Sequence, residues 1–88
     1  MVEREIKVIN TLGVHARPAS KIVQTANRYK SNISLCREKT MADAKSILNV
    51  MMLGANYDTS VTIRASGEDE KDAVNAIASL FEQKFNEE

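Results

Sequence analysis

The chain has 88 residues, a length suited to one domain with one hydrophobic core. Apolar residues make up 43% and charged residues 27%, values that exclude a disordered or acidic solvating segment. Twelve Lys and Arg balance twelve Asp and Glu, and this zero net charge argues against non-specific binding of nucleic acid. No apolar run approaches the roughly 18 residues of a membrane span, and the first residues lack the apolar stretch of a signal peptide. We expect one cytoplasmic domain over residues 1–88, without membrane insertion, whose function lies at a surface site.

The first half of the chain predicts a strand, a helix and a pair of short strands. Residues 2–8 alternate apolar and polar side chains, which is typical of a half-buried strand. Apolar residues from 16 to about 29 recur at the spacing of one helical face. Apolar side chains within 33–41 suggest two short strands joined near 37–39. Cys36, the lone cysteine, lies on one of these strands and can form neither an internal disulfide nor a metal cage by itself.

The second half predicts a short helix, a strand and a final helix. Residues 47–53 are nearly all apolar, with Ser46 placed as N-cap and Gly54 as the stop. Residues 60–66 alternate clearly, and an acidic segment at 66–70 then opens the last helix, where negative charge suits the helix dipole. The buried stripe of that helix consists of Ala73, Ile77, Leu80 and Phe81.

The order strand–helix–strand–strand–helix–strand–helix predicts an α+β fold. The clearest of these strands alternate apolar and polar side chains. One face of the sheet should therefore be exposed to solvent, as is common in antiparallel sheets. The helices should then all pack on the other face. We therefore expect an open-faced two-layer β-sandwich with a four-stranded antiparallel sheet and three helices on one side.

The candidate functional residues lie in segment 13–19, GVHARPA, where a loop becomes the first predicted helix. Pro18 fits a first helical turn, because its missing N–H costs nothing there. His15 should therefore lie at or beside the N-cap, next to the unpaired backbone N–H groups that begin at Ala16 and favour anions. Arg17 adds a planar donor group that suits phosphate oxygens.

These residues place a nucleophile beside an anion site. Neutral imidazole is a nucleophile near neutral pH, and the helix terminus and Arg17 both disfavour its protonated form. No metal and no cofactor is expected. A lone histidine in a small protein is also commonly a surface residue or a helix cap, and chemistry alone leaves that alternative open.

Two segments resemble a known family. Segment 13–19 is similar to the active-site motif of the HPr family, the histidine-containing phosphocarriers of the bacterial phosphotransferase system. Segment 45–54, KSILNVMMLG, is similar to the family's regulatory-serine segment. The resemblance implies that His15 accepts a phosphoryl group on Nδ1 from phospho-Enzyme I and passes it to Enzyme II A domains, with Arg17 steadying the group. It also implies the open-faced sandwich, and a carrier that is a substrate of two transfers rather than an independent enzyme.

Ser46 has two interpretations. A serine before a helix is commonly a simple N-cap that stabilises it by about 1 kcal/mol. The resemblance adds a regulatory role, phosphorylation by HPr kinase/phosphorylase. Since a phosphate at a helix N-terminus is compatible with the fold, inhibition would act by placing a dianion beside an apolar docking patch.

A surface for partner proteins is expected after Ser46, because segment 47–53 has too many apolar residues for one side of a short helix. We expect Leu48 and Met51 to be exposed, as methionine suits several partners in turn. Basic residues near the first helix, among them Arg28 and Lys30, would steer an acidic partner. The residues assigned to partner binding are Ser20, Lys21, Ile47, Leu48 and Met51. A carrier must expose its site to different proteins alternately, so a monomer is expected.

Other functions remain as alternatives. The nearest is a nitrogen-related or purely regulatory phosphorelay without sugar transport, because segments 10–13 and 51–53 look similar to that branch of the family. A small binding module, such as a ferredoxin-like RNA binder, fits poorly with two Phe, two Tyr, no Trp and zero net charge. A metabolic enzyme acting alone fits less well still, because no second acid, base or metal cluster accompanies His15.

Overall fold

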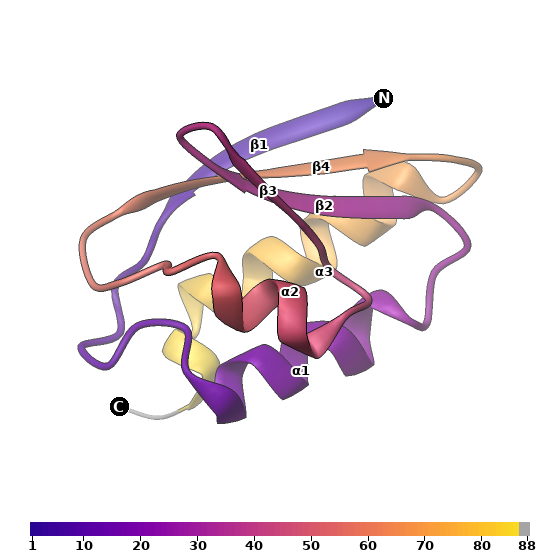
Figure 1. Ribbon diagram of the computed structural model, residues 1–88. Helices are drawn as coiled ribbons and strands as arrows, with labels where there is room; N and C mark the ends of the chain where they lie inside the picture. The colour runs from indigo at the N-terminus through magenta and orange to yellow at the C-terminus, as the bar shows by residue number, and fades with distance from the viewer. Residues whose placement is uncertain (87–88) are drawn as a thin grey trace.

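The computed structural model describes residues 1–86, which form a sheet with helices on one of its faces (Figure 1). Its strands are β1 (Val2–Lys7), β2 (Asn32–Arg37), β3 (Thr40–Asp43) and β4 (Ser60–Ser66), and its helices are α1 (Ala16–Ala26), α2 (Ile47–Met52), α3 (Glu70–Glu82) and the 3₁₀ helix η1 (Lys84–Asn86). The predicted fold class and element order are confirmed, apart from η1, which the sequence did not indicate. None of the helices among the described residues has the length and apolar character needed to cross a membrane.

The sheet is antiparallel throughout, in the order β1-β4-β2-β3. The central strand β4 turns Val61, Ile63 and Ala65 inward, and all three side chains are buried. Leu35 pairs with Ile63 on one side and with Ala42 on the other, so a row of apolar residues crosses the inner face. The alternation predicted for these strands is therefore confirmed, and the outer face carries mostly polar side chains.

The inner face of the sheet is covered mainly by α3, which packs on β1, β4 and β2, while α1 lies between α2 and α3. Ala73, Ile77 and Phe81 of α3 are buried, as their spacing predicts, and Leu80 is partly buried against the core. In the edge strand β1 only Val2 and Ile6 are half-buried, and the other residues are exposed. Its inward-facing Arg4 reaches the rim of the helical layer and pairs with Glu82 of α3 at 3.0 Å.

Two local differences from the sequence expectation have clear causes. Helix α1 ends at Ala26 rather than near residue 29, because the following turns tighten: the Tyr29 amide donates to the Ala26 carbonyl at 3.1 Å. Asn27 also closes the end, since its side-chain amide donates to the Val23 carbonyl at 2.9 Å. At the other end of the chain, Phe85 in η1 is buried edge-on against Phe81, with ring centroids 4.9 Å apart.

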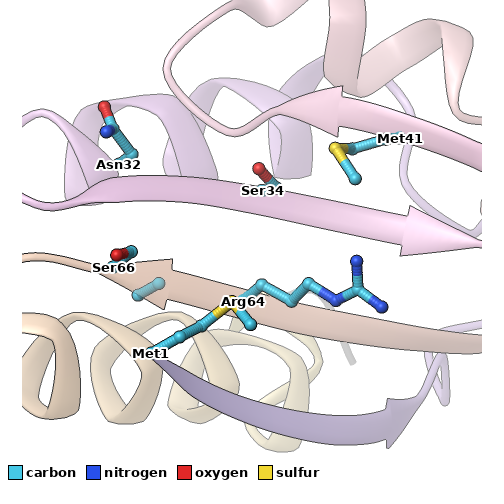
Figure 2. Close-up of a pocket in the computed structure, with 7 residues that line it drawn as sticks. Met1, Asn32, Ser34, Met41, Arg64 and Ser66 are labelled. Atoms are coloured by element: carbon cyan, nitrogen blue, oxygen red, sulfur yellow. The ribbon is translucent and has the colours of Figure 1, made fainter.

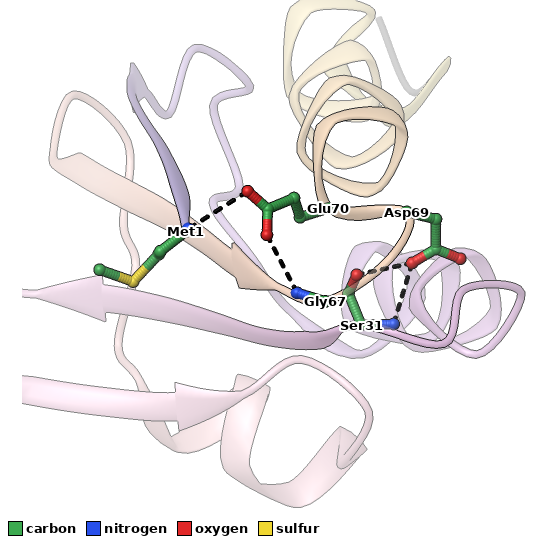
Figure 3. A network of polar contacts seen from close by, with 5 residues as sticks. All are labelled: Met1, Ser31, Gly67, Asp69 and Glu70. Atoms are coloured by element: carbon green, nitrogen blue, oxygen red, sulfur yellow. Dashed lines mark hydrogen bonds and ion pairs between the residues drawn. The ribbon is translucent and has the colours of Figure 1, made fainter.

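A polar network ties the start of α3 to the α1–β2 turn (Figure 3). The Asp69 carboxylate accepts hydrogen bonds from the Ser31 hydroxyl at 2.6 Å, the Ser31 amide at 2.9 Å and the Lys30 amide at 2.9 Å. The bond from the Ser31 hydroxyl, followed by that from the Lys30 amide, lowers the pKa of Asp69 to about 2. The ionised carboxylate therefore holds two turns together that are far apart in sequence.

The neighbouring Glu70 makes a second link in the same region (Figure 3). It accepts a hydrogen bond from the Gly67 amide at 3.1 Å and pairs with the amino group of Met1 at 3.2 Å. The bond from Gly67, and then the amino group, lower the pKa of Glu70. The N-terminal end of α3 is thus occupied by the protein's own carboxylates.

Candidate functional site

His15 is the N-cap residue of α1, as its place before Ala16 and Pro18 predicts. Its backbone is extended, with φ −91° and ψ −164°, and its carbonyl accepts the Ala19 amide at 2.9 Å to start the helix. The imidazole makes no capping hydrogen bond to the helix. Pro18 is the third helical residue, so the amides of Ala16 and Arg17 are the N–H groups that the first turn presents beside the histidine.

The His15 ring is half-buried, and its Nε2 atom is inside the protein surface. Burial of Nε2 favours the other ring nitrogen, Nδ1, for contact with an incoming group. Arg17 and Ala16 are exposed next to it. Within residues 1–86 the Arg17 guanidinium has neither a hydrogen bond nor an ion pair, so its five donors can meet an anion from outside.

The loop that carries His15 packs against the segment that follows α2. The Val14 amide donates to the Ala55 carbonyl at 2.9 Å. Gly13 adopts a φ of +68°, and a Cβ atom built there would lie 2.8 Å from the Ala55 oxygen. Only glycine allows both the left-handed conformation and this close approach. The loop after α2 therefore serves as the platform on which the histidine loop rests.

Asn10 stabilises the same loop by hydrogen bonds to Gly13. It is completely buried, and its side-chain amide donates to the Gly13 carbonyl at 2.7 Å, while the Gly13 amide donates back to the Asn10 carbonyl at 3.0 Å. Sequence reasoning used this segment only as a likeness to one family branch and missed its structural role. An asparagine three residues before a glycine was the available signal, since both residue types favour tight turns. Ala55 gave no signal, because it acts through its backbone.

Ser46 is the N-cap of α2, the simpler of its two interpretations. Its Oγ accepts the Asn49 amide at 3.3 Å and the Asn49 side-chain amide at 3.0 Å. Both lone pairs of the hydroxyl are therefore engaged by one residue. The side chain is half-buried and lies at the start of the helix that carries the expected apolar surface.

The apolar surface of α2 consists of Ile47, Leu48, Met51 and Met52, all exposed. Leu48 is 65% exposed and Met51 is 44% exposed, which confirms the expectation for both. Met52, at 73%, is the most exposed of the four and was not singled out from the sequence. A helix of six residues buries only one side, here Val50, so the other side chains must face outward.

Ser20 and Lys21, the other residues assigned to partner binding, are half-buried on α1. The Lys21 ammonium donates to the Phe85 carbonyl of η1. This lysine therefore fastens the end of the described chain to α1, a role that the sequence did not suggest.

The structure also has a shallow hollow of about 170 Å³, which lies on the outer face of the sheet (Figure 2). It is lined by Met1, Asn32, Ser34, Met41, Arg64, Ala65 and Ser66. None of the predicted site residues lines this hollow. Within residues 1–86, no group of three or more His, Cys, Asp or Glu side chains could hold a metal ion.

The chain is similar to proteins of one known family. A family model described as the PTS HPr component phosphorylation site matches residues 2–83. Phosphocarrier protein HPr of Xylella fastidiosa (strain Temecula1) is 44% identical over 88 residues, covering 100% of this chain and 99% of that protein.

Solved structures of HPr proteins are also similar to this chain. HPr from Thermoanaerobacter tengcongensis superposes with a TM-score of 0.95 at 41% identity, covering 100% of this chain and 99% of that one. An HPr dimer from the same organism gives a TM-score of 0.77 at 40% identity, covering 97% and 98%. With a family model matching most of its length and a close relative spanning all of it, the chain belongs to the HPr family, the phosphocarriers of the phosphotransferase system.

Proposed function

We propose that this chain accepts a phosphoryl group on His15 Nδ1 from phospho-Enzyme I and passes it to Enzyme II A domains. The observation that carries the proposal is the place of His15 at the start of α1, half-exposed, with Nε2 buried and the uncommitted Arg17 beside it. The chain acts in the cytoplasm as one HPr-like domain over residues 1–88. It is a carrier and not an independent enzyme.

The transfer proceeds in line between two imidazoles. The lone pair of neutral His15 Nδ1 attacks the phosphorus as the bond from phosphorus to the donor nitrogen breaks, and the donor leaves as the uncharged ring. The phosphoryl oxygens meet the amides of Ala16 and Arg17 and the Arg17 guanidinium. The reverse sequence delivers the group to the acceptor, so the same contacts serve both transfers.

The test is incubation with Enzyme I and phosphoenolpyruvate, followed by measurement of acid-labile phosphate on the protein. We expect His15→Ala to abolish labelling and Arg17→Ala to lower the transfer rate roughly tenfold or more. Lys71→Ala removes an exposed cation from α3 and should leave the rate unchanged. Labelling that survives in His15→Ala would overturn the proposal.

Ser46 is the second site of the proposal, as a target of HPr kinase/phosphorylase. A dianion on this residue would lie beside the apolar surface of α2 and make its burial against Enzyme I costly. Ser46→Asp should therefore slow phosphoryl transfer from phospho-Enzyme I by raising KM. Ser60→Asp, on an exposed serine of β4, is the matched control and should have no effect. A rate equal to that of the wild type in Ser46→Asp would count against regulation at this site.

A nitrogen-related or regulatory branch is the second candidate function. Segment 10–13 resembles that branch, and its Asn10 shapes the loop that presents His15. Transfer from the phosphorylated protein to a sugar-specific A domain, compared with a nitrogen-type A domain, separates the two. Faster transfer to the nitrogen-type domain would favour this branch.

We also propose that the working form is a monomer. An exposed His15 loop and an exposed surface on α2 suit a protein that meets its partners one at a time. Sedimentation velocity across a range of concentrations tests this, and a dimer that persists on dilution would contradict it. The dimeric HPr from Thermoanaerobacter tengcongensis makes the measurement worthwhile.

A further inference from the structure

Arg37, at the end of β2, makes a contact that the phosphocarrier role does not explain. Its Nε donates to the Leu53 carbonyl at 2.9 Å, and its side chain is only 28% exposed. Leu53 is the C-cap of α2. The last carbonyls of a helix lack helical partners and carry partial negative charge, so a guanidinium is a strong partner for them. Arg37 therefore fixes the end of α2 to the β2–β3 hairpin.

The same guanidinium also lies over the turn that follows α2. Gly54 reverses the chain there with a φ of +70°, and a Cβ atom built on it would lie 3.2 Å from Arg37 Nη2. The direction in which the chain leaves the helix is therefore set by Gly54 and held by Arg37. The next residue, Ala55, is buried and supplies the carbonyl that accepts the Val14 amide.

The far end of the α2–β4 loop is held by backbone contacts, by the Thr59 hydroxyl, which donates to the Asn56 carbonyl at 2.6 Å, and by an exposed ion pair between Lys7 and Asp58 at 3.5 Å. The Asp58 amide donates to the Val8 carbonyl at 2.8 Å, and the Thr59 amide donates to the Asn56 carbonyl at 3.1 Å. At the near end, the hydrogen bond from Arg37 is the side-chain contact that fixes Leu53, two residues before the Ala55 carbonyl.

We infer that Arg37 is a positioning residue for His15, acting through Leu53 and Ala55 on the backbone of Gly13 and Val14. The inference rests on the proposed function for its consequence, because only phosphoryl transfer makes the exact place of His15 matter. If Ala55 moves, Val14 moves with it, and the imidazole shifts against the amides of α1 that receive the phosphoryl oxygens. Small displacements of a reacting group have large effects on rate.

The experiment compares Arg37→Ala with the wild type by amide hydrogen exchange and by transfer kinetics with phospho-Enzyme I. We expect exchange of the Val14 amide to rise roughly tenfold, since a charge-assisted hydrogen bond is lost, while the amides of β4 keep their protection. We expect kcat to fall about threefold to tenfold with KM changed by less than about twofold, because the group is misplaced and docking is intact.

Three further variants make the result specific. Lys39→Ala removes an exposed cation from the same hairpin, and Glu38→Gln removes the exposed ion pair at 3.8 Å from Arg37; both should behave as the wild type. Arg37→Lys keeps the charge and a donor group but not the planar guanidinium over the turn, so it should restore part of the protection. It also serves as the test variant if Arg37→Ala does not fold.

Two outcomes would overturn the inference. One is unchanged Val14 exchange and unchanged kcat in Arg37→Ala. The other is exchange that rises equally at Val14 and throughout β4, which would make Arg37 a stabiliser of the whole fold. If the wild type takes no phosphate from Enzyme I, the proposed function fails, and the exchange data still decide whether Arg37 positions the loop.

Discussion

The N-termini of α1 and α3 present the same helix dipole in opposite ways. At α3, acidic residues occupy the first turn, and Asp69 and Glu70 bind neighbouring backbone groups in a network that closes the fold. At α1 there is no acidic residue in the first turn, and His15 and Arg17 stand there instead. The α3 terminus carries carboxylates of the protein itself, which favour the helix dipole and link distant turns, and the α1 terminus suits an anion supplied by a partner. On the proposed function, the difference separates a helix start that stabilises the fold from one that receives the phosphoryl group.

The comparison is tested most severely by giving α1 an acidic residue of its own. Arg17→Glu should lower phosphoryl transfer by about 100-fold or more, because a carboxylate replaces the guanidinium beside the incoming phosphoryl group. It should at the same time stabilise α1 by about 0.3–1 kcal/mol. Transfer assays and urea denaturation measure the two effects. Lys71→Glu makes a similar exchange of charge in the first turn of α3 and should leave transfer unchanged. A loss of transfer in both variants would mean that added negative charge repels the phosphorylated partner wherever it lies on the protein.

The opposite change is to remove a carboxylate from α3. Asp69→Asn should lower the free energy of unfolding at neutral pH. The free energy of unfolding of this variant should also change less with pH in the acidic range. The pKa of Asp69 is about 2 in the folded protein, below the ordinary value of about 4. Between these two pH values the Asp69 carboxyl therefore binds more protons in the unfolded state than in the folded state. The wild type should therefore be fully stabilised above about pH 4 and lose this contribution as the pH falls toward 2.

Thermal unfolding between pH 2 and pH 7 measures this effect. Asp72→Asn, at an exposed position in the first turn of α3, should keep the acid dependence of the wild type. Phosphoryl transfer at neutral pH should be retained in Asp69→Asn as long as the protein is folded. A large loss of transfer would mean that the two helix termini are coupled.

The platform beneath His15 is tested by adding one methyl group. Gly13→Ala should destabilise the protein by about 1–3 kcal/mol, because the left-handed φ is strained and the Cβ meets the Ala55 oxygen. Gly54→Ala has nearly the same φ of +70°, but its nearest neighbour is the flexible end of Arg37. It should cost less, and the difference measured by urea denaturation isolates the backbone clash. Equal losses would mean that φ alone matters.

The smallest effect is expected at the short helix. Ser46→Ala should lower the free energy of unfolding by about 1 kcal/mol, because the Oγ atom that accepts from Asn49 is lost, and Ser46→Gly should cost only a few tenths. Chemical denaturation checks both values. A cost near zero for Ser46→Ala would show that the cap contributes little beyond its backbone.

Local patterns predicted most of the elements and the place of the site. The start of α1 followed from Pro18, and the start of α2 from Ser46, because capping and proline chemistry act within a few residues. The strands could be predicted from alternating apolar and polar residues, because one face of the sheet is exposed to solvent. The exposed Leu48 followed from the number of apolar residues in a helix too short to bury them.

What the sequence did not indicate depends on contacts between distant segments. Phe85 is buried only because Phe81 and the fold bring it there, and residues 84–86 all have positive φ, which no local pattern suggests. The role of Ala55 is carried by a carbonyl group, and every residue has one. Arg37 looked like part of a hairpin turn, and its partner Leu53 lies 16 positions away.

The fit of Gly13 against the chain after α2 restricts how this loop can change. The atoms nearest to its missing side chain are backbone atoms of Ala55 and Asn56. A steric clash between two side chains can be relieved by replacing one of them with a smaller residue. A main-chain oxygen, in contrast, is present whatever residue stands at position 55. A selection for second-site suppressors of a bulkier residue 13 should therefore yield revertants, and no compensating exchange at 55 or 56.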